Sequence, residues 1–418
     1  MSSRPLRIAW LGAGPIQQES GGVPGVATEL LYGLTALGHR IDCFLPGAER
    51  DVPERLTARP GLTFVWGTSR WRTNRWYSNT EATRFISGLL ARSFGSLRVR
   101  REVARRHAQE PYDVVYQFSS IEALALPRAM QDRVPVAMQP ETHMAGELKA
   151  LIAERELGAR CHSRRQLALV IAVRFVRTLV QRRRIRRAGL LVCISSVFRD
   201  HMVRDYRFPP ERTVVIPNPV RIERFEFADL ARGVGSPARI LVLGRVAVRK
   251  GVEDVIAVAR RLAQRGADVR IRVVGGPDLT SDYTKLLDDL PERNSEYVGR
   301  IAPAQVPDEL AASDLLLQAS KYEPFGLTVG EALAAGVPVV ATTEVGAIEQ
   351  VDPTVAAAVA PGDVDGLVEA VEATLAHLRE EPAAMRALAR SEAERRYAPA
   401  VVCGEVSAAL QALVAARR

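Results

Sequence analysis

Short apolar runs alternate with longer amphipathic stretches along most of the chain. The runs, such as Arg7–Leu11 and Val269–Val274, span only a few residues and are bounded by glycine, proline or polar positions, as buried parallel strands are. The stretches between them, such as Val26–Leu37 followed by Gly38, have the spacing and the C-terminal glycine of helices. Regular alternation of strand and helix predicts an α/β protein with parallel sheets.

The alternation occurs twice, which predicts two domains. It stops in a segment rich in glycine, serine and proline and restarts at Arg239–Leu243. We therefore expect a first domain over residues 1–222, a linker over 223–237 and a second domain over 238–397, followed by a last amphipathic helix within 398–418. A chain of 418 residues is long enough for two ordinary domains.

One strand–turn–helix–strand stretch, residues 315–340, offers backbone amides to a ligand. Pro324 and Gly326 interrupt the chain after the first strand, and the helix begins near Leu327. The amides from Phe325 onward therefore point out of a helix N-terminus at the carboxyl end of a strand. Open α/β sheets bind ligands at this edge, and a helix N-terminus favours a phosphate.

Two carboxylates, Glu323 and Glu331, lie in the same stretch. Carboxylates repel phosphate, so they would serve another part of the ligand, and sugar or ribose hydroxyls suit them because a carboxylate accepts two hydrogen bonds. The alternative is an acidic helix start that interacts favourably with the helix dipole. Spacing alone leaves both interpretations open.

The residues around the two carboxylates are more specific. Glu323 and Glu331 have the spacing of an E-x7-E motif, and Pro324–Thr328 matches that motif residue for residue. The segment resembles the donor-binding motif of retaining glycosyltransferases of family 4, which have the GT-B fold. The resemblance implies two Rossmann-like, parallel-sheet domains that face a central cleft, with the final helix crossing back onto the first domain.

A second motif follows the first strand of the second domain. Gly244-Arg245 and Lys250-Gly251 are similar to the G-R-x4-K-G donor-phosphate motif of the same family. Two fixed cations beside a helix N-terminus suit a diphosphate, and they would stabilise the negative charge that grows there as the sugar leaves. Two solvated surface cations are the alternative.

The resemblance implies roles for further positions. Glu323 would bind hydroxyls of the donor sugar and Glu331 those of the ribose. His143, just past a predicted strand, would face the cleft as the catalytic candidate of the first domain, with Glu141 a weaker candidate; a loop histidine without a role is the alternative. The other donor-binding candidates lie at glycine turns, near the base or at the helix N-terminus: Gly21, Gly22, Gly244, Gly275, Gly299, Arg300, Ile301, Phe325, Gly326, Leu327 and Thr328.

Several patterns argue against other classes. Gln17 replaces the third glycine of a dinucleotide fingerprint after Gly12-Ala13-Gly14, which argues against NAD. The four cysteines are far apart, which suits neither a zinc site nor a disulfide scaffold and favours a reducing, cytoplasmic compartment. We find no apolar run near the roughly 18–20 residues of a membrane span and no secretory signal. We expect no cofactor and no metal.

Charge is uneven along the chain. Residues 1–227 carry 36 Lys and Arg against 21 Asp and Glu, whereas the remainder carries 21 against 27. Arginines with interspersed aromatics fill 69–107, and 146–188 is expected to form one or two long helices with a stripe of Arg174, Arg177, Gln181 and Arg184 and an apolar face. This favours an anionic acceptor or an anionic membrane surface as a partner. Solvated helix faces are the alternative, and no recognition motif supports nucleic acid.

The resemblance to this family implies a retaining glycosyltransferase that moves a sugar from a nucleotide-sugar to an acceptor hydroxyl. The mechanism would be front-face and metal-independent, and the enzyme would be cytoplasmic, with the inner membrane face as a candidate location. An anionic or lipid-linked cell-envelope acceptor is expected; a small secondary metabolite or soluble sugar is the alternative. A sugar-nucleotide epimerase and a non-catalytic GT-B binding protein are the other classes considered.

Overall fold

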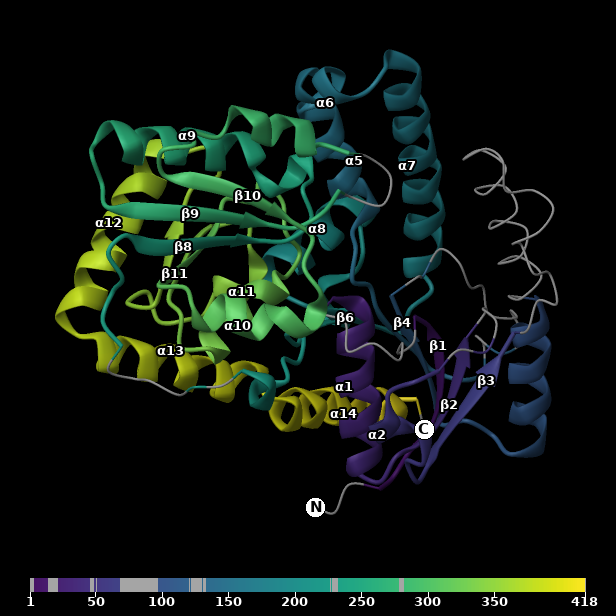
Figure 1. The fold of residues 1–418 in the computed structure, drawn as a ribbon. Coiled ribbons are helices and arrows are strands. Elements are labelled where there is room, and N and C mark those ends of the chain that lie inside the picture. Colours follow the sequence, from purple (N-terminus) through teal and green to yellow (C-terminus); the bar gives the residue numbers. More distant parts are fainter. Residues whose placement is uncertain are drawn as a thin grey trace.

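The computed structural model describes residues 4–13, 22–45, 49, 51–67, 97–119, 121, 130, 133–225, 227, 232–277 and 282–417. Within them, two parallel sheets form the centres of two α/β units (Figure 1). The strand orders are β3-β2-β1-β4-β5-β6-β7 and β10-β9-β8-β11-β12-β13. In each sheet the order reverses beside the first strand, and open α/β sheets bind ligands at such a point. The prediction of two Rossmann-like, parallel-sheet domains is confirmed.

The first unit contains the seven-stranded sheet. Its strands are β1 (Arg7–Gly12), β2 (Arg40–Leu45), β3 (Leu62–Trp66), β4 (Val114–Phe118), β5 (Val136–Gln139), β6 (Leu190–Cys193) and β7 (Thr213–Val215). Its helices are α1 (Val23–Ala36), α2 (Glu54–Thr57), α5 (Met144–Ala153), α6 (Arg155–Cys161), α7 (Arg164–Ile185) and α8 (Ser196–Tyr206), with further helical residues over 97–109. Strands β1, β4 and β5 are buried along almost their whole length because helices cover both faces of the sheet.

The second unit contains the six-stranded sheet. Its strands are β8 (Ala238–Leu243), β9 (Val269–Val274), β10 (Ser295–Gly299), β11 (Leu315–Gln318), β12 (Val339–Thr342) and β13 (Ala356–Val359). Its helices are α9 (Val252–Gln264), α10 (Val306–Ala311), α11 (Leu327–Ala334), α12 (Val364–Glu380) and α13 (Pro382–Tyr397). Short 3₁₀ helices are η1 (Pro210–Arg212), η2 (Ile222–Arg224), η3 (Val248–Lys250), η4 (Thr284–Asp289), η5 (Pro303–Gln305) and η6 (Gly346–Ile348).

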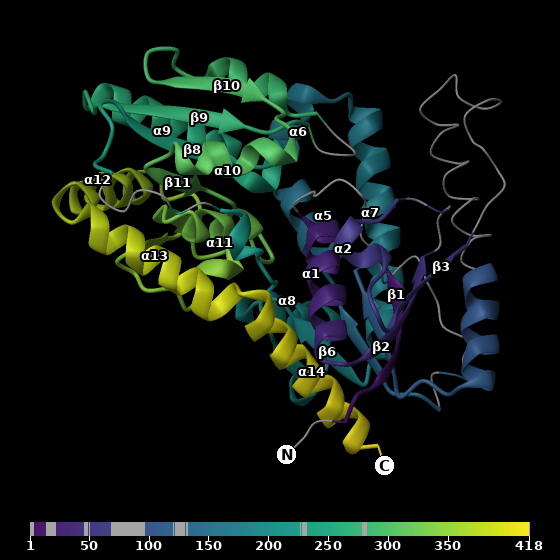
Figure 2. The ribbon, with the colours of Figure 1, turned by 60° about the horizontal axis from the view of Figure 1, so that its bottom comes forward.

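The last helix, α14 (Pro399–Ala415), leaves the second unit and lies against α1 of the first (Figure 2). Its apolar side buries Val402, Val406 and Leu410 in the core that α1 and β1 share. Gly33 of α1 allows the contact, because a Cβ there would overlap the sulfur of Cys403. The end of the chain thus ties the two units together by apolar packing.

The helical stretch Pro382–Ala415 is long and apolar enough to cross a membrane by length and composition alone. The expectation that no such stretch exists is therefore wrong. The core helix of a soluble protein passes the same test, and packing of α14 on α1 accounts for part of its apolar surface, since 33% of the apolar window is buried.

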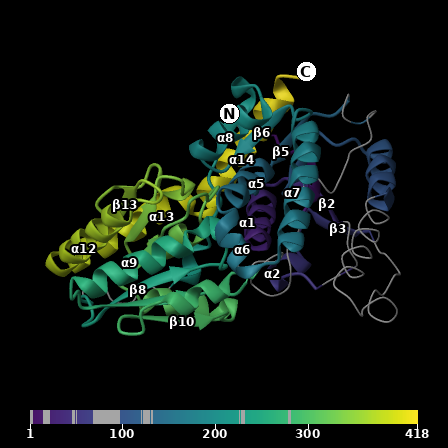
Figure 3. The same cartoon turned by 90° about the horizontal axis from the view of Figure 1, so that it is seen from above.

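Helix α7 presents a different face to the protein than its sequence suggests. The predicted stripe faces inward: Arg174 pairs with Glu147 of α5, Gln181 is buried, and Arg184 donates to the carbonyl oxygen of Ile121 at 2.9 Å. Figure 3 shows α7 beside α5. Hydrogen bonds and an ion pair satisfy these buried polar groups. The apolar face of α7 is therefore the one exposed to solvent.

The start of α9 depends on Gly251, which has φ 68° and lies against the backbone of Ala319. A Cβ on Gly251 would overlap the Ala319 carbonyl oxygen, whereas Gly266, with the same φ, has no atom within 4 Å of its Cβ position. Gly266→Ala should lower the free energy of unfolding by about 1–2 kcal/mol through backbone conformation alone. Gly251→Ala should lower it by a further 1–3 kcal/mol or so through overpacking. Denaturant unfolding measures both, and equal losses would contradict the predicted clash.

Candidate active site

Two loops that follow neighbouring strands of the second sheet lie together. Strands β8 and β11 are paired, so the loop after β8, which contains η3, and the loop after β11 leave the sheet side by side. Backbone hydrogen bonds join them, because the amides of Lys321 and Tyr322 donate to the carbonyl oxygen of Arg249 at 2.9 and 3.3 Å. Residues distant in sequence are thereby held at one edge of the sheet.

This arrangement places Glu323 against Lys250 and Arg249. Arg249 Nη1 lies 2.9 Å from Glu323 Oε2, Lys250 Nζ contacts the same oxygen, and the Glu323 side chain is only 12% exposed. Burial raises the pKa of Glu323, but the charges and hydrogen bonds of Lys250 and Arg249 outweigh it and lower the pKa to about 2. Burial lowers the pKa of Lys250, and the charge of Glu323 opposes that change. Glu323 is therefore ionised at neutral pH, and Lys250 and Arg249 hold its side chain in place.

Glycines let the surrounding loops approach one another. Gly244 lies beside Lys250, with its Cβ position 3.8 Å from Lys250 Nζ. A Cβ on Gly275 would overlap the carbonyl oxygen of Gly244, and the amide of Gly275 donates to the carbonyl oxygen of Gly299 at 2.8 Å. The three predicted glycines therefore meet at the ends of β8, β9 and β10.

Three other predicted residues border these glycines in sequence. The Arg300 side chain covers the turn after β9, since its Nε lies 2.8 Å from the Cβ position of Gly276. Ile301 is half-buried against the core, and Arg245 is exposed. Arg245 still acts electrostatically on the loop after β8, because its charge contributes to lowering the pKa of Lys250.

The N-terminus of α11 follows Glu323 directly. Gly326 caps the helix with φ 96°, Phe325 is buried, and Leu327 packs at the edge of the core. Thr328 donates through Oγ1 to Gln318 Oε1 at 2.9 Å. Gln318 Nε2 is buried and has no hydrogen-bond partner, so this site has a donor available for a ligand.

Glu331 lies in the second turn of α11, beyond the cationic loop. Burial raises the pKa of Glu331 to about 7, against the opposing charge of Arg224 in η2. The two carboxylates of the motif therefore differ: Glu323 is ionised throughout the neutral range, whereas Glu331 changes charge within it.

The structure places His143 differently from the expected position in the cleft. The side chain is fully buried, with Nδ1 3.0 Å from the hydroxyl of Tyr322 and Nε2 3.4 Å from Asp205 Oδ2. Burial lowers the pKa of His143 to about 3, although Asp205 opposes this change. His143 touches the neighbour of Glu323 instead of open space, because Tyr322 of the second unit covers it.

Glu141 belongs to a separate buried network in the first unit. It accepts from Gln139 Nε2 at 2.9 Å and from Asn218 Nδ2 at 2.6 Å. Burial raises the pKa of Glu141 to about 7, and these two hydrogen bonds limit the rise. Of the predicted loop glycines, Gly22 precedes α1 with φ 76°, and Gly21 lies outside the described residues.

Three residues that surround Glu323 and the start of α11 in the structure were not predicted as site residues from the sequence: Arg249, Gln318 and Tyr322. Arg249 precedes Lys250 directly, but the motif does not include that position. Gln318 offered a signal, since it is a polar residue at the end of the apolar run Leu315–Leu317. Tyr322 carried no signal, because its partner His143 is remote in sequence.

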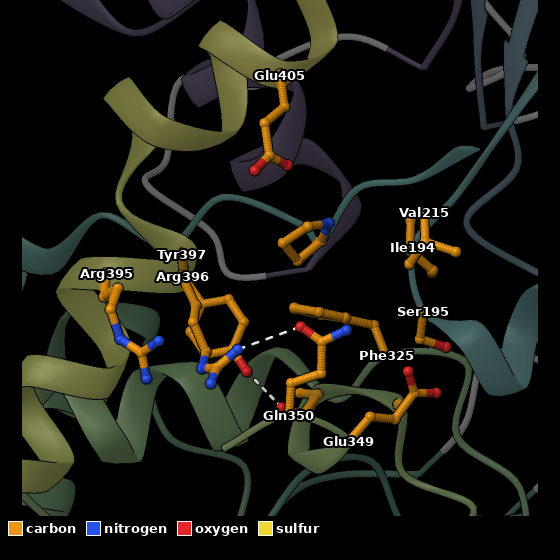
Figure 4. Close-up of a pocket in the computed structure, with 13 residues that line it drawn as sticks. Ile194, Ser195, Val215, Phe325, Glu349, Gln350, Arg395, Arg396, Tyr397 and Glu405 are labelled. Carbon is orange, nitrogen blue, oxygen red and sulfur yellow. Dashed lines mark hydrogen bonds between the residues drawn. The ribbon is translucent and has the colours of Figure 1, made fainter. Parts of the chain in front are cut away.

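A cavity of about 250 Å³ lies where the two units meet near the α13–α14 junction (Figure 4). Glu349 forms part of its wall and binds the N-terminus of α8, accepting from the amides of Ser196 and Val197 at 2.8 and 2.5 Å. Arg396 donates to Gln350 across it at 3.2 Å. Other lining residues are Ser195, Phe325, Arg395, Tyr397 and Glu405. Phe325 connects this cavity to the start of α11.

The fold and these loops define a two-domain GT-B protein with a cationic and helix-terminal site at the edge of its second sheet. Two family models match the chain: "Glycosyl transferases group 1" over residues 231–392 and "Glycosyltransferase Family 4" over residues 20–224. The chain belongs to this family of glycosyltransferases.

Individual relatives agree with this assignment. A probable transglycosylase of Burkholderia thailandensis is 27% identical over 91% of this chain and 90% of its own length. Mannosylfructose-phosphate synthase of Agrobacterium fabrum is 31% identical, but the match spans only 38% of either chain. Sucrose-phosphate synthase from Thermosynechococcus elongatus has the same fold, with a TM-score of 0.66 and 18% identity over 98% of this chain and all of the other. Anabaena HepE, solved with UDP-glucose, has a TM-score of 0.62 and 18% identity over 97% of this chain and all of its own.

The raised pKa of Glu331 predicts a pH-dependent stability. An unfolded glutamate ionises near pH 4.5, so a folded pKa of about 7 means that ionisation of Glu331 opposes folding as the pH rises from about 4.5 to 7. Glu331→Gln should therefore raise the free energy of unfolding at pH 8 by about 3 kcal/mol and have little effect below pH 4.5. Thermal melts across pH 4–9 measure this. Glu369→Gln, on an exposed position of α12, is the control, and a pH-independent effect of Glu331→Gln would contradict the prediction.

Proposed function

We propose that this chain transfers a hexosyl group from a nucleoside diphosphate sugar to an acceptor hydroxyl, with retention of anomeric configuration and without a catalytic metal. The observation that carries the proposal is the placement of Glu323 between Lys250 and Arg249, directly before the N-terminus of α11. A carboxylate for sugar hydroxyls and cations for a diphosphate are thereby combined within one site.

The proposed chemistry needs few protein groups. The bond between the anomeric carbon and the diphosphate oxygen breaks, and the acceptor oxygen bonds to the same face of the sugar while its proton passes to the leaving phosphate. Lys250 has three N–H donors, so it can contact Glu323 and the diphosphate together, and Arg245 and the α11 amides complete the anion site. These groups would stabilise the leaving charge more in the transition state than in the ground state.

Uridine diphosphate sugars are the donors to test first, since HepE, a structural neighbour, was solved with UDP and with UDP-glucose. In the proposed complex, Glu331 accepts hydrogen bonds from the ribose hydroxyls, and Gln318 Nε2 supplies a further donor to the ligand. The glycine turns at Gly244, Gly275 and Gly299, beside Arg300, would leave space for the nucleotide.

The acceptor side of the proposal rests on α7. One side of this helix is apolar and exposed, with Leu169 65%, Val176 58% and Leu179 50% exposed. The exposed arginines Arg165 and Arg183 flank that stripe at helical spacing. Because apolar side chains with flanking arginines suit an anionic lipid surface, we propose that α7 docks the enzyme on the cytoplasmic membrane face, beside a lipid-linked or anionic acceptor.

Donor binding is tested by thermal melting with UDP, GDP, ADP and TDP and their sugars. One nucleotide should raise the Tm of the wild type, and Lys250→Ala should reduce that shift. With the preferred donor, Lys250→Ala should lower the rate about 10²–10³-fold, because one stabilising cation is lost at the diphosphate. Lys285→Ala, at an exposed lysine, should behave as the wild type.

Two further measurements on the same reaction test its mechanism. Proton NMR of the product should show the donor's anomeric configuration, and the rate should be the same with and without added Mg²⁺ or Mn²⁺. An inverted product would exclude the retaining mechanism, and the lack of a Tm shift with every nucleotide would exclude the proposed donor site.

Membrane docking is tested with vesicles containing phosphatidylglycerol. The double variant Leu169→Gln/Leu179→Gln should bind at least about tenfold more weakly than the wild type, because each leucine contributes roughly 1.5 kcal/mol or more when it leaves water. Leu37→Gln/Leu97→Gln removes two leucines that are 48% and 50% exposed elsewhere and serves as the matched control. Equal losses in both variants, or no binding of the wild type at low salt, would contradict the proposal.

A further inference from the structure

The turn that contains Glu323 contacts the first unit on both sides of this residue. Before Glu323, the hydroxyl of Tyr322 lies 3.0 Å from His143 Nδ1. After it, the carbonyl oxygen of Pro324 accepts a hydrogen bond from Ser195 Oγ at 2.8 Å. Both contacts are buried, and Tyr322 itself is only 5% exposed. Two buried contacts with the first unit therefore flank the carboxylate of the candidate donor site.

The ring of Tyr322 lies against α5 of the first unit, where Gly146 provides the space for it. A Cβ on Gly146 would lie 2.5 Å from Tyr322 Cζ and 2.8 Å from His143 Nδ1, closer than real Cβ atoms approach other atoms. On α8, the ring centroid of His201 lies 5.4 Å from that of Tyr322. We call His143, Gly146 and His201 the Tyr322 seat. The seat accepts the tyrosine ring only because position 146 carries no side chain.

The cations beside Glu323 do not by themselves fix the position of the turn. Lys250 and Arg249 have long side chains that can follow the carboxylate if the turn shifts. The backbone is held within the second unit, where the amide of Glu323 donates to the carbonyl oxygen of Glu344 at 3.1 Å. Glu344 in turn contacts the first unit, since its Oε2 lies 3.3 Å from His201 Nε2. The first unit therefore contributes to the position of the turn.

His143 is suited to accept a hydrogen bond from Tyr322. Burial lowers the pKa of His143 to about 3, so its ring is neutral at physiological pH. Asp205 Oδ2 lies 3.4 Å from Nε2 and favours the proton on that nitrogen, which leaves Nδ1 as the acceptor for the tyrosine hydroxyl. Without this hydroxyl, Nδ1 would be buried without a partner, so the contact is specific for tyrosine over phenylalanine.

We propose that Tyr322 is a positioning residue, which aligns the carboxylate of Glu323 with the donor sugar by anchoring the turn to the first unit. The sugar part of this proposal rests on the proposed function, in which Glu323 binds hydroxyls of the donor sugar. In that complex the nucleoside and the diphosphate are bound by other groups of the second unit. Loss of the anchor should therefore weaken recognition of the sugar and leave binding of the nucleotide unchanged.

The first test needs no ligand and measures amide hydrogen exchange in the full chain. The amides of Lys321, Tyr322 and Glu323 are hydrogen-bonded within the second unit, so their exchange reports whether the turn is in place. Gly146→Ala should make them exchange at least about fivefold faster, because overpacking disrupts the seat. Gly404→Ala, at a helical glycine of α14 with no atom within 4 Å of its Cβ position, is the matched control and should exchange as the wild type does.

The second test compares the affinities for UDP and UDP-glucose by calorimetry. Tyr322→Phe should weaken binding of UDP-glucose about three- to tenfold, the factor that one ordinary hydrogen bond represents, and leave binding of UDP unchanged. Tyr112→Phe removes a buried hydroxyl of the first unit that donates to Asp42 Oδ2 at 2.5 Å, and it should change neither affinity. If the melting experiments select another base, the corresponding nucleotide and its glucose derivative replace this pair.

Unchanged amide exchange in Gly146→Ala would overturn the proposal. It would also be overturned if Tyr322→Phe bound UDP-glucose like the wild type, or lost affinity for both ligands equally. Melting curves establish that the variants fold, and amide exchange in Tyr322→Phe keeps the first test decisive if Gly146→Ala does not. A wild type that binds no nucleotide would contradict the proposed function instead, and amide exchange would still decide whether the seat holds the turn.

Discussion

The buried carboxylate of Glu323 sets the main constraint on this structure. A carboxylate in this position requires opposite charge, and Lys250 and Arg249 supply it from the loop after the neighbouring strand. The same short turn also contacts the first unit at two points. Tyr322 meets His143 of the first unit, and Ser195 of the first unit donates to the carbonyl oxygen of Pro324 at 2.8 Å. The donor loop is therefore part of the interface between the units.

Two kinds of contact hold the units together, one apolar and one polar. The packing of α14 on α1 is apolar and ties the end of the chain to the first unit. The contacts near the donor loop include polar ones, such as Glu349 on the N-terminus of α8 and Lys321 Nζ at 2.7 Å from Glu154. Polar contacts are directional, so they fix the orientation of the donor loop against the first unit.

The local features of the site were predictable because they depend on short stretches of sequence. Pro324 and Gly326 end one element and start the next, and the observed helix begins at Leu327 as the pattern predicts. Other features were not predictable. The stripe of Arg174, Gln181 and Arg184 resembled a solvated face, yet it faces the protein because Glu147 and backbone carbonyls satisfy its charges. Periodicity identifies two faces of a helix but did not decide which one is buried here, since the apolar face with Leu169, Val176 and Leu179 is the exposed one.

The sequence by itself determined the alternation of strands and helices, the two-domain order and the E-x7-E turn, because backbone conformation and hydrophobic periodicity act over neighbouring residues. Only the tertiary structure decided which remote groups meet. It brought Arg249 to Glu323 by pairing β8 with β11, and it buried His143 under Tyr322 by closing one unit on the other. The charge states of Glu323 and Glu331 were decided in the same way, because a pKa depends on burial and on partners that no local pattern specifies.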